Sequence, residues 1–249
     1  MVRSMERLRK KVCKWAFAVM VAALSMVMFS ACLKDSGNEG YPVAAVRALN
    51  AVPGSELLDI GLDQNKLNFD QVSWRAEDFA YGDTLPYKNA WPGNRLVRVF
   101  EAGSPQGTQP LARQTVTFTP GRFYSLYVVG QDDDMEILSI EDDLTAPGQG
   151  KAKLRFIHLS PDAPSLDFGV HGADTLIASD KSFKEIEAFS LIDAGEIYTF
   201  DIIGHSSGDV LHSFDFEPKN GMIYTIWAKG LTADGADPAV AFGHGILTH

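Results

Sequence analysis

From residue 43 onward, apolar residues occur in short runs that alternate with polar positions. His212, Phe214 and Phe216 share one face of such a run, whereas Ser213 and Asp215 share the other. A period of two is the pattern of a half-buried β-strand. Pro-Gly and Asn-Gly pairs separate the runs, and no window after Gly40 sustains the apolar stripe of a helix over three turns. The pattern therefore predicts an all-β protein.

The predicted strands fall into two groups. In the first half of the chain they are Ala44–Asn50, Leu57–Leu62, Leu96–Glu101, Thr115–Phe118, Tyr124–Val129 and Met135–Glu141. In the second half they are Lys153–His158, Ser165–His171, Ile197–Ile203, Val210–Phe216, Met222–Lys229 and Ala239–Phe242.

The two halves are similar in sequence. Val46–Leu62 aligns without a gap on Leu154–Val170, and it pairs Arg47 with Arg155, Pro53 with Pro161, Leu58 with Leu166, Asp59 with Asp167, and Gly61 with Gly169. Two later segments of each half align in the same order. This indicates a tandem duplication with about 100 residues per unit, a length typical of an immunoglobulin-like antiparallel β-sandwich. We therefore expect two tandem sandwich domains, residues 43–145 and 152–249, joined by the short linker 146–151 and packed end to end.

The first 31 residues have a different character. Six Lys or Arg residues precede an apolar run from Trp15 to Phe29, and Ser30 and Ala31 are small. This order is typical of a signal peptide, here a signal helix over residues 1–31, and the apolar run is short for a membrane span. Met28 to Cys32 resembles a bacterial lipobox, with Phe29 where Leu is commonest. The resemblance implies cleavage between Ala31 and Cys32 and acylation of Cys32.

Cysteine usage and charge agree with an exported protein. Cys32 is the only cysteine after the signal peptide, so no disulfide forms within the mature chain. Residues 32–42 are polar and glycine-bearing, which predicts a flexible tether. Lys34-Asp35 resembles the signal that sends some Gram-negative lipoproteins to the outer cell surface. We therefore expect a protein anchored by lipid in the outer membrane and facing the cell surface, with the periplasmic face as the alternative.

The formal net charge is −10, but residues 32–249 carry 16 basic and 31 acidic residues, or 16 − 31 = −15. So acidic a chain repels phosphate backbones, which argues against nucleic acid as a partner.

The segment Leu154–Val170 (LRFIHLSPDAPSLDFGV) resembles the signature of domain-of-unknown-function family 4397. Ser160 to Pro164, followed by Leu166-Asp167, is the specific part, and the first repeat keeps only Pro53 and Leu58-Asp59 of it. The resemblance implies an extracytoplasmic β-sandwich and brings no catalytic residues.

The sequence contains several residue groups that could carry chemistry. Ser160 and Asp162 beside His158 suggest a hydrolase, but Ser is followed by Pro, and Asp-Ala-Pro is turn chemistry. Asp59 and Asp167 are expected to accept hydrogen bonds from turn amides. The acids of residues 132–136 and 141–143 are expected to be solvated loop charges rather than calcium ligands. No His shows metal-ligand spacing, so neither a metal nor a cofactor is expected.

Trp91, in the sequence NAWPGN, is the best candidate for binding, because an aromatic ring on an exposed turn can stack on a sugar ring or a partner side chain. Trp74, Tyr81 and Tyr87 lie in an insertion peculiar to the first repeat and extend the expected face. The alternative is that the indole folds back over the end of the sandwich. Thr84 and Thr175, each in an Asp-Thr-Leu triplet, match a motif for O-glycosylation.

The sequence thus predicts a non-enzymatic surface lipoprotein that binds glycan or protein. A structural envelope component without a small ligand is the alternative, and a hydrolase is the third.

Overall fold

The computed structural model describes residues 42–70, 72–132, 134–233 and 237–249, and residues 42–249 form one compact unit. The predicted signal helix, Ala31, Cys32 and nearly all of the tether lie outside the described residues, as does Asp133 of the acidic loop. The described residues are strands, turns and loops without a helix, so they contain no helical segment able to cross a membrane.

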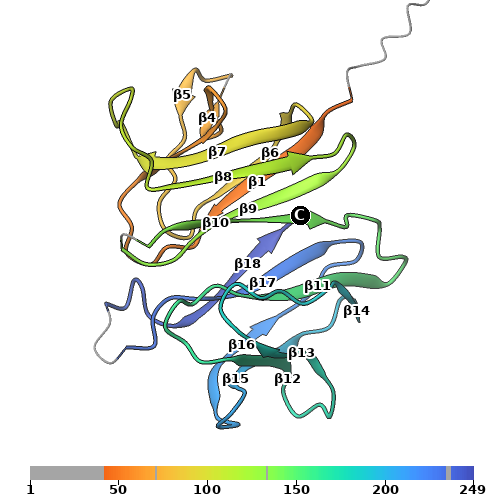
Figure 1. Ribbon diagram of the computed structural model, residues 1–249. Coiled ribbons are helices and arrows are strands. Elements are labelled where there is room, and N and C mark those ends of the chain that lie inside the picture. Colours follow the sequence, from red (N-terminus) through yellow and green to blue (C-terminus); the bar gives the residue numbers. More distant parts are fainter. Residues whose placement is uncertain (1–41, 71, 133, 234–236) are drawn as a thin grey trace, which may run out of the picture. The chain divides into compact units, whose positions relative to one another are not determined.

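The all-β prediction is confirmed (Figure 1). The strands of the first repeat are β1 (Ala44–Asn50), β2 (Leu58–Leu62), β3 (Asn65–Lys66), β4 (Phe69–Asp70), β5 (Arg75–Ala76), β6 (Thr84–Ala90), β7 (Gly93–Glu101), β8 (Ala112–Phe118), β9 (Phe123–Val129) and β10 (Glu136–Asp142). Those of the second are β11 (Lys151–His158), β12 (Leu166–Val170), β13 (Leu176–Lys181), β14 (Ser190–Asp193), β15 (Tyr198–Gly204), β16 (Val210–Phe216), β17 (Ile223–Lys229) and β18 (Gly243–Thr248).

Each repeat folds into a sandwich of two four-stranded sheets, and the strand orders of the two sandwiches correspond. Sandwich 1 has an inner sheet of order β10-β9-β1-β6 and an outer sheet of order β3-β2-β7-β8. Sandwich 2 repeats this plan with β18-β17-β11-β14 and β13-β12-β15-β16. The sheets are not wholly antiparallel, because β1 pairs with β9, and β11 with β17, in parallel.

Each sandwich has its own core between its two sheets. In sandwich 1 it is mostly aliphatic, with Val46, Ile60, Val97 and Leu126 wholly buried. In sandwich 2 it contains a stack of phenylalanine rings, in which Phe168 lies 4.8 Å from Phe156 and 5.3 Å from Phe200 between ring centroids. Packing two sheets face to face buries alternate residues of every strand.

A third apolar layer joins the sandwiches. Leu49, Ala51, Tyr127 and Val129 of sandwich 1 form one cluster with Ile157, Leu159, Trp227 and Leu247 of sandwich 2. The central strands of both inner sheets therefore bury both faces, and β1 and β9 read as nearly continuous apolar runs. The expected end-to-end packing is wrong: the inner sheets meet face to face, because each carries a second apolar surface that must leave water.

Strands β6 and β14, at the edges of the inner sheets, were not predicted, and neither were β3, β4, β5 and β13. β6 contains Pro86, which cannot donate a ladder hydrogen bond and is tolerated at a sheet edge. β14 is only four residues long and alternates between half-buried and exposed positions. Ala239–Phe242 is not a strand of the sheet, since the closing strand β18 begins at Gly243.

Candidate functional site

The Ser160–Asp162 turn is held together by hydrogen bonds that use the groups a hydrolase would need. The Ser160 hydroxyl donates to the Gly230 carbonyl at 2.6 Å, whereas His158 Nδ1 accepts only the Ser160 backbone N–H, at 3.3 Å. Burial lowers the pKa of His158. The Asp162 carboxylate accepts the N–H groups of Thr232 and Ala233 at 2.9 to 3.1 Å. These contacts join the Ser160–Asp162 turn to residues 230–233 at one end of sandwich 2. The Ser160 hydroxyl is therefore not hydrogen-bonded to the His158 imidazole.

The two repeated aspartates lie at equivalent places on β2 and β12. Asp59 accepts hydrogen bonds from the Gly103 N–H, Asn68 and Lys66 at 3.0, 3.0 and 2.6 Å. Burial by itself raises the pKa of Asp59, but the hydrogen bonds from Lys66 and Asn68 outweigh it, so the pKa is lowered. Both carboxylates tie neighbouring segments to their sheet: the partners of Asp167 are the Asp180 N–H, the Ser179 hydroxyl and the His205 imidazole.

The other residues of the repeat signature shape the backbone around these aspartates. Pro53 and Pro161 each lie in a turn soon after the first strand of their repeat. Gly61 and Gly169 follow the aspartates by two positions, and a Cβ on Gly169 would lie 3.1 Å from Leu176.

The acids of residues 132–143 do not converge on one point in the described residues. Glu136 pairs with Lys184 at 3.0 Å, Asp142 with Arg155 at 2.5 Å, and Asp143 with Lys153 at 2.9 Å. Across the described part of the chain, no group of three or more His, Cys, Asp or Glu side chains is arranged to hold a metal ion.

Two of the four predicted binding aromatics, Tyr81 and Tyr87, direct their side chains into the layer between the sandwiches. Tyr81 packs edge-on against Trp227, and burial raises its pKa to about 12. The Tyr87 hydroxyl donates to Asp142 at 2.7 Å and lies 2.8 Å from His249 Nδ1. The expectation that these rings lie on an exposed face with Trp91 is therefore wrong for both hydroxyl-bearing side chains, which pack into the inner layer, although Tyr87 is also among the lining residues of the cleft that contains Trp91.

Tyr87 belongs to a polar cluster within the third layer. Arg155 and Asp142 form an ion pair whose side chains are 3% and 0% exposed, and Arg155 also donates to Tyr127 and Thr225. Ser125 donates to the same carboxylate at 2.7 Å. The ion pair connects the two sandwiches, since Asp142 ends β10 and Arg155 lies on β11. Sequence alignment pairs Arg155 with Arg47 but gives no sign of this partner.

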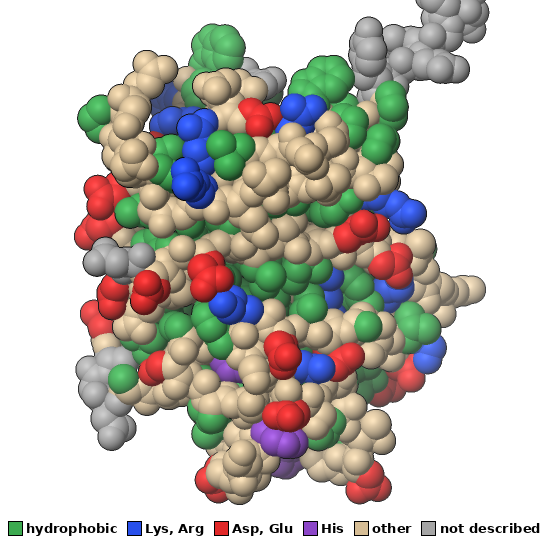
Figure 2. All heavy atoms as spheres, in the orientation of Figure 1, with side chains coloured by type: hydrophobic (Ala, Val, Ile, Leu, Met, Phe, Trp, Pro, Cys, Tyr) green, Lys and Arg blue, Asp and Glu red, His purple; other side chains and the backbone are tan. Residues whose placement is uncertain are grey.

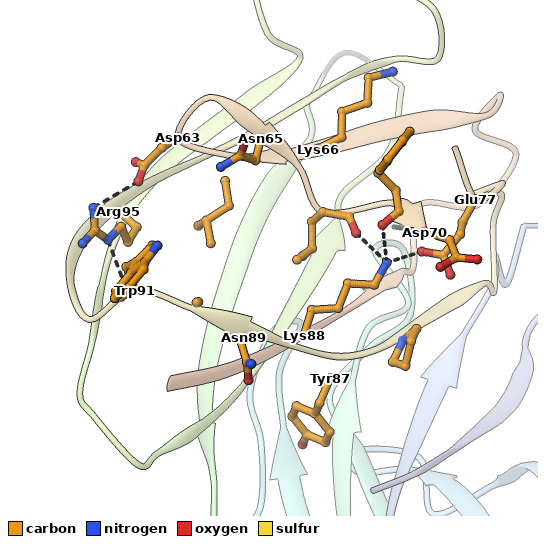
Figure 3. A pocket seen from close by; sticks show the side chains of 15 residues that line it. Asp63, Asn65, Lys66, Asp70, Glu77, Tyr87, Lys88, Asn89, Trp91 and Arg95 are labelled. Atoms are coloured by element: carbon orange, nitrogen blue, oxygen red, sulfur yellow. Dashed lines mark hydrogen bonds and ion pairs between the residues drawn. The ribbon is translucent and has the colours of Figure 1, made fainter. Parts of the chain in front are cut away.

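The other two aromatics remain on the surface of sandwich 1. Trp91 is 57% exposed at the turn between β6 and β7, and Trp74 is 76% exposed on the β4–β5 hairpin, where its ring tilts against Phe69. Trp91 and Phe69 line one cleft of about 620 Å³ at the end of sandwich 1, which we call the end cleft (Figure 3). Its walls are β3, the β4–β5 hairpin, β6 and the start of β7, so the inserted segment of the first repeat builds it.

One end of this cleft is organised by Lys88. Its ammonium group donates to the carbonyls of Leu67 and Phe69 at 2.9 and 3.1 Å and forms an ion pair with Glu77. These contacts fasten the inserted hairpin to β6. In Figure 3, Lys88 points toward Glu77 across the cleft, whereas Tyr87 and Asn89, its neighbours on the strand, point away.

The other end is organised by Arg95, which lies beside Trp91. The Arg95 guanidinium donates to the carbonyls of Trp91 and Pro92 at 2.9 and 2.6 Å and pairs with Asp63 at 3.2 Å. The second Asp63 oxygen accepts the Leu96 N–H at 2.9 Å. The turn that carries the indole is therefore held by side-chain contacts.

The lining of the end cleft carries charges of both signs. Its carboxylates are those of Asp63, Asp70 and Glu77, and it includes no Ser, Cys or His. Hydrogen bonds from Ser73 and Val72 lower the pKa of Asp70, whereas a catalytic acid needs a raised pKa. Sequence reasoning missed Lys88, Asp63, Glu77 and Arg95. The sequence does contain a signal that could have pointed to Lys88 and Arg95, because basic residues are concentrated between residues 88 and 113 of an otherwise acidic chain.

Thr84 and Thr175, the candidate O-glycosylation residues, are both exposed in the described structure. Thr84 begins β6, and Thr175 lies just before β13.

The fold and the end cleft define a class of protein: paired β-sandwiches with a polar, aromatic-edged cleft. The chain belongs to the family described as Domain of unknown function (DUF4397), whose profile matches residues 44–169, from β1 into β12. No curated protein matches the chain.

Among solved structures, the chain is similar to a structure described as alpha-glucan binding by a streptococcal virulence factor. The two sequences are 14% identical, the match covers 76% of this chain and 92% of that one, and the TM-score is 0.26. A family CBM26 module of Eubacterium rectale Amy13K in complex with maltoheptaose has 12% identity, coverage of 83% and 96%, and a TM-score of 0.26. The Bacillus anthracis TIE protein has 12% identity, coverage of 76% and 34%, and a TM-score of 0.22. At these TM-scores, the similarities carry no inference about a ligand.

Proposed function

We propose that this chain is a non-enzymatic cell-envelope lipoprotein that binds glycan through the end cleft of sandwich 1. The observation that carries the proposal is the cleft itself, which places an exposed indole beside ion-paired side chains. Its volume of about 620 Å³ lies within the range of small-ligand sites. The same end of the chain's second sandwich lacks the inserted β4–β5 segment that forms one wall.

Sugar chemistry fits this lining. A sugar ring presents C–H groups on its faces and hydroxyl groups around its edge. An aromatic ring such as Trp91 packs against the apolar face, and charged side chains form strong hydrogen bonds with the hydroxyls. Because Arg95 is held by several contacts, little of its side-chain entropy is lost when a ligand binds. Lys88 already donates its N–H groups to Leu67, Phe69 and Glu77, so its role is to hold the wall of the cleft in place.

A glycan array with the purified protein tests this function, followed by titration of the best ligand against variants. Trp91→Ala should weaken binding by about 30-fold, the loss expected when a central aromatic contact is removed. Ile197→Ala, which truncates a 72% exposed apolar residue of sandwich 2, is the matched control and should leave affinity unchanged. If no glycan binds, or if Trp91→Ala binds like the parent, the structural envelope role replaces this proposal.

The lipid anchor at Cys32 and display on the cell surface are part of the same proposal. They rest on the lipobox resemblance and on the acidic, disulfide-free composition of the chain after it. Cys32→Ala should release the protein from the membrane fraction, and protease added to intact cells should cleave the parent protein. Resistance to protease together with dependence on Cys32 would place the domains in the periplasm.

A further inference from the structure

A second cleft lies on the outer sheet of sandwich 1, next to the end cleft, with which it shares Asn65 and Lys66. It has a volume of about 410 Å³, and we call it the outer cleft. Its floor is Gly61 and Arg98, on neighbouring strands, and Phe100 forms one wall. Lys66, Asp59 and the loop Ser104–Thr108 complete the lining. A Cβ on Gly61 would meet only the backbone oxygens of Asn65 and Arg98, at 3.4 and 3.9 Å, so glycine keeps the floor low.

Two arginines face each other beside this cleft. Arg98 of β7 is the register partner of Arg113 of β8, and both point outward, because Val97 and Val99 point into the core. Like charges directly opposite one another on a sheet destabilise it. Arg113 has no ion-pair or hydrogen-bond partner among the described residues. Arg98 donates to the Asp63 carbonyl, but its Nε is buried without a partner in the described structure.

The fold does not require this arginine pair. At the equivalent positions of sandwich 2, Asp201 lies opposite Gly169 and Ser213, and the Ser213 hydroxyl donates to the Asp201 carboxylate at 2.5 Å. The same register position is thus basic in one sandwich and acidic in the other. In Figure 2 a group of Lys and Arg side chains lies on the upper sandwich and the His side chains in view lie on the lower one, while both sandwiches also carry charges of the other sign.

We propose that the outer cleft binds the carboxylate of an acidic sugar residue. The planar Arg98 guanidinium matches a carboxylate. Lys66 is already paired with Asp59, a carboxylate that also lines the cleft, at 2.6 Å, so Arg98 supplies the positive charge that no lining carboxylate balances. The Phe100 ring offers a surface for the apolar face of the sugar. Gln64, Asn65 and Thr108 also line the cleft and supply amide and hydroxyl groups for the ring hydroxyls.

The size and charge of the surroundings favour a single acidic residue over a long polyanion. The volume fits a ligand of one or two sugar rings. Residues 32–249 carry a net charge of −15, which opposes the approach of an extended anionic chain. The proposal goes beyond the end cleft and does not depend on glycan binding there, although Asn65 and Lys66 line both clefts.

Calorimetric titration of the purified protein tests the site with D-glucuronate, D-galacturonate and N-acetylneuraminate. D-glucose is the neutral comparator, and acetate and inorganic phosphate represent free anions. At least one acidic sugar should bind about tenfold or more tightly than glucose, acetate and phosphate, and its affinity should fall as salt is raised. Equal binding of glucose would exclude recognition of the carboxylate. Equal binding of acetate or phosphate would show that the cleft accepts a free anion rather than an acidic sugar.

Variants then locate the site. Arg98→Gln should weaken binding of the acidic sugar by about 10- to 100-fold. Arg122→Gln, the same change at an exposed arginine on the β8–β9 turn, is the matched control and should bind like the parent. Lys66→Gln should weaken binding several-fold and provides a second probe if Arg98→Gln unfolds.

The two clefts can be separated by one further pair of measurements. Trp91→Ala should leave binding of the acidic sugar intact, and Arg98→Gln should leave binding in the end cleft intact. If Arg98→Gln instead changes the oligomeric state and leaves sugar affinity unchanged, the arginine face is a contact between copies of the chain, and the proposal is wrong.

Discussion

The two sandwiches share one strand plan but differ in what their outer sheets present to solvent. Sandwich 1 places Arg98 opposite Arg113, whereas sandwich 2 places Asp201 opposite Ser213 at the same register. In sandwich 2 the Asp201 carboxylate accepts a hydrogen bond from the Ser213 hydroxyl and also lies 2.7 Å from His171 Nδ1, so both Asp201 and Ser213 have a hydrogen-bond partner. The comparison teaches that the register of a sheet fixes which residues face outward and leaves their charge free to change.

The inner sheets show the opposite behaviour, because both their faces are buried. Arg47 and Arg155 occupy equivalent positions, and both are directed into the layer between the sandwiches. Arg155 meets the Asp142 carboxylate there, and Arg47 donates to the Thr248 carbonyl at 2.6 Å. Both inner positions thus keep an arginine where the outer positions change charge, although the Arg47 Nε has no hydrogen-bond partner among the described residues.

The largest effect should come from breaking the contact that joins the sandwiches. Asp142→Ala removes the acceptor of Arg155, Tyr87 and Ser125 and leaves a buried arginine without its counter-ion. We expect the free energy of unfolding to fall by about 3–5 kcal/mol. Urea denaturation followed by tryptophan fluorescence measures it.

The neighbouring residue supplies the control for that experiment. Glu141 is half exposed and lies 3.7 Å from the exposed Arg122, so Glu141→Ala should cost less than about 1 kcal/mol. Equal losses for the two variants would mean that the buried pair contributes no more than a surface pair.

A smaller effect should appear as a dependence on pH. Burial, together with Arg155 and Arg47, lowers the pKa of His249 to about 3 from its ordinary value of 6.5. The folded state therefore resists protonation of His249, and its stabilising contribution is present above pH 6.5 and is lost as the pH falls toward 3. Between pH 6.5 and 5 the parent should lose about 2 kcal/mol through this group.

The His249→Gln variant isolates that contribution. It should be less stable than the parent at pH 7, since Tyr87 and Thr225 lose the partners that the imidazole provides. The difference should narrow as the pH falls to 5, measured by urea denaturation at each pH. A difference that stays constant would show that His249 takes up no additional proton on unfolding.

The smallest effect concerns the outer sheets themselves. Arg113→Ser gives sandwich 1 the residue that sandwich 2 has at this position and removes the like charge opposite Arg98. Stability should rise by about 0.2–1 kcal/mol at low salt, and the gain should shrink when salt screens the charges. A loss of stability in thermal unfolding would show that the arginine pair contributes to the fold.

Most of the strand pattern was predictable from the sequence, and two predicted boundaries, Ala44–Asn50 and Val210–Phe216, coincide with those observed. The alternation of apolar and polar residues and the turn residues depend only on neighbouring positions, so they can be recognised in the sequence alone. The edge strands β6 and β14 were not predicted because these signals are weak there: β6 contains Pro86, and β14 is a short, half-exposed run. Trp91 could be named as a binding residue, whereas Arg95 and Lys88, which shape its cleft, reach it from segments whose proximity depends on the fold.

The sequence by itself determined the all-β class, the two repeated units and the equivalence of their signature positions, because each depends on the order of residues along one strand or turn. Only the tertiary structure decided how the units meet. The apolar second faces of β1, β9, β11 and β17 have no partner within their own sandwich, so burial of these faces brings the inner sheets together. That packing takes Tyr81 and Tyr87 out of the surface and brings Asp142 to Arg155. It leaves the outer sheets, with their opposite charges, as the faces that meet solvent.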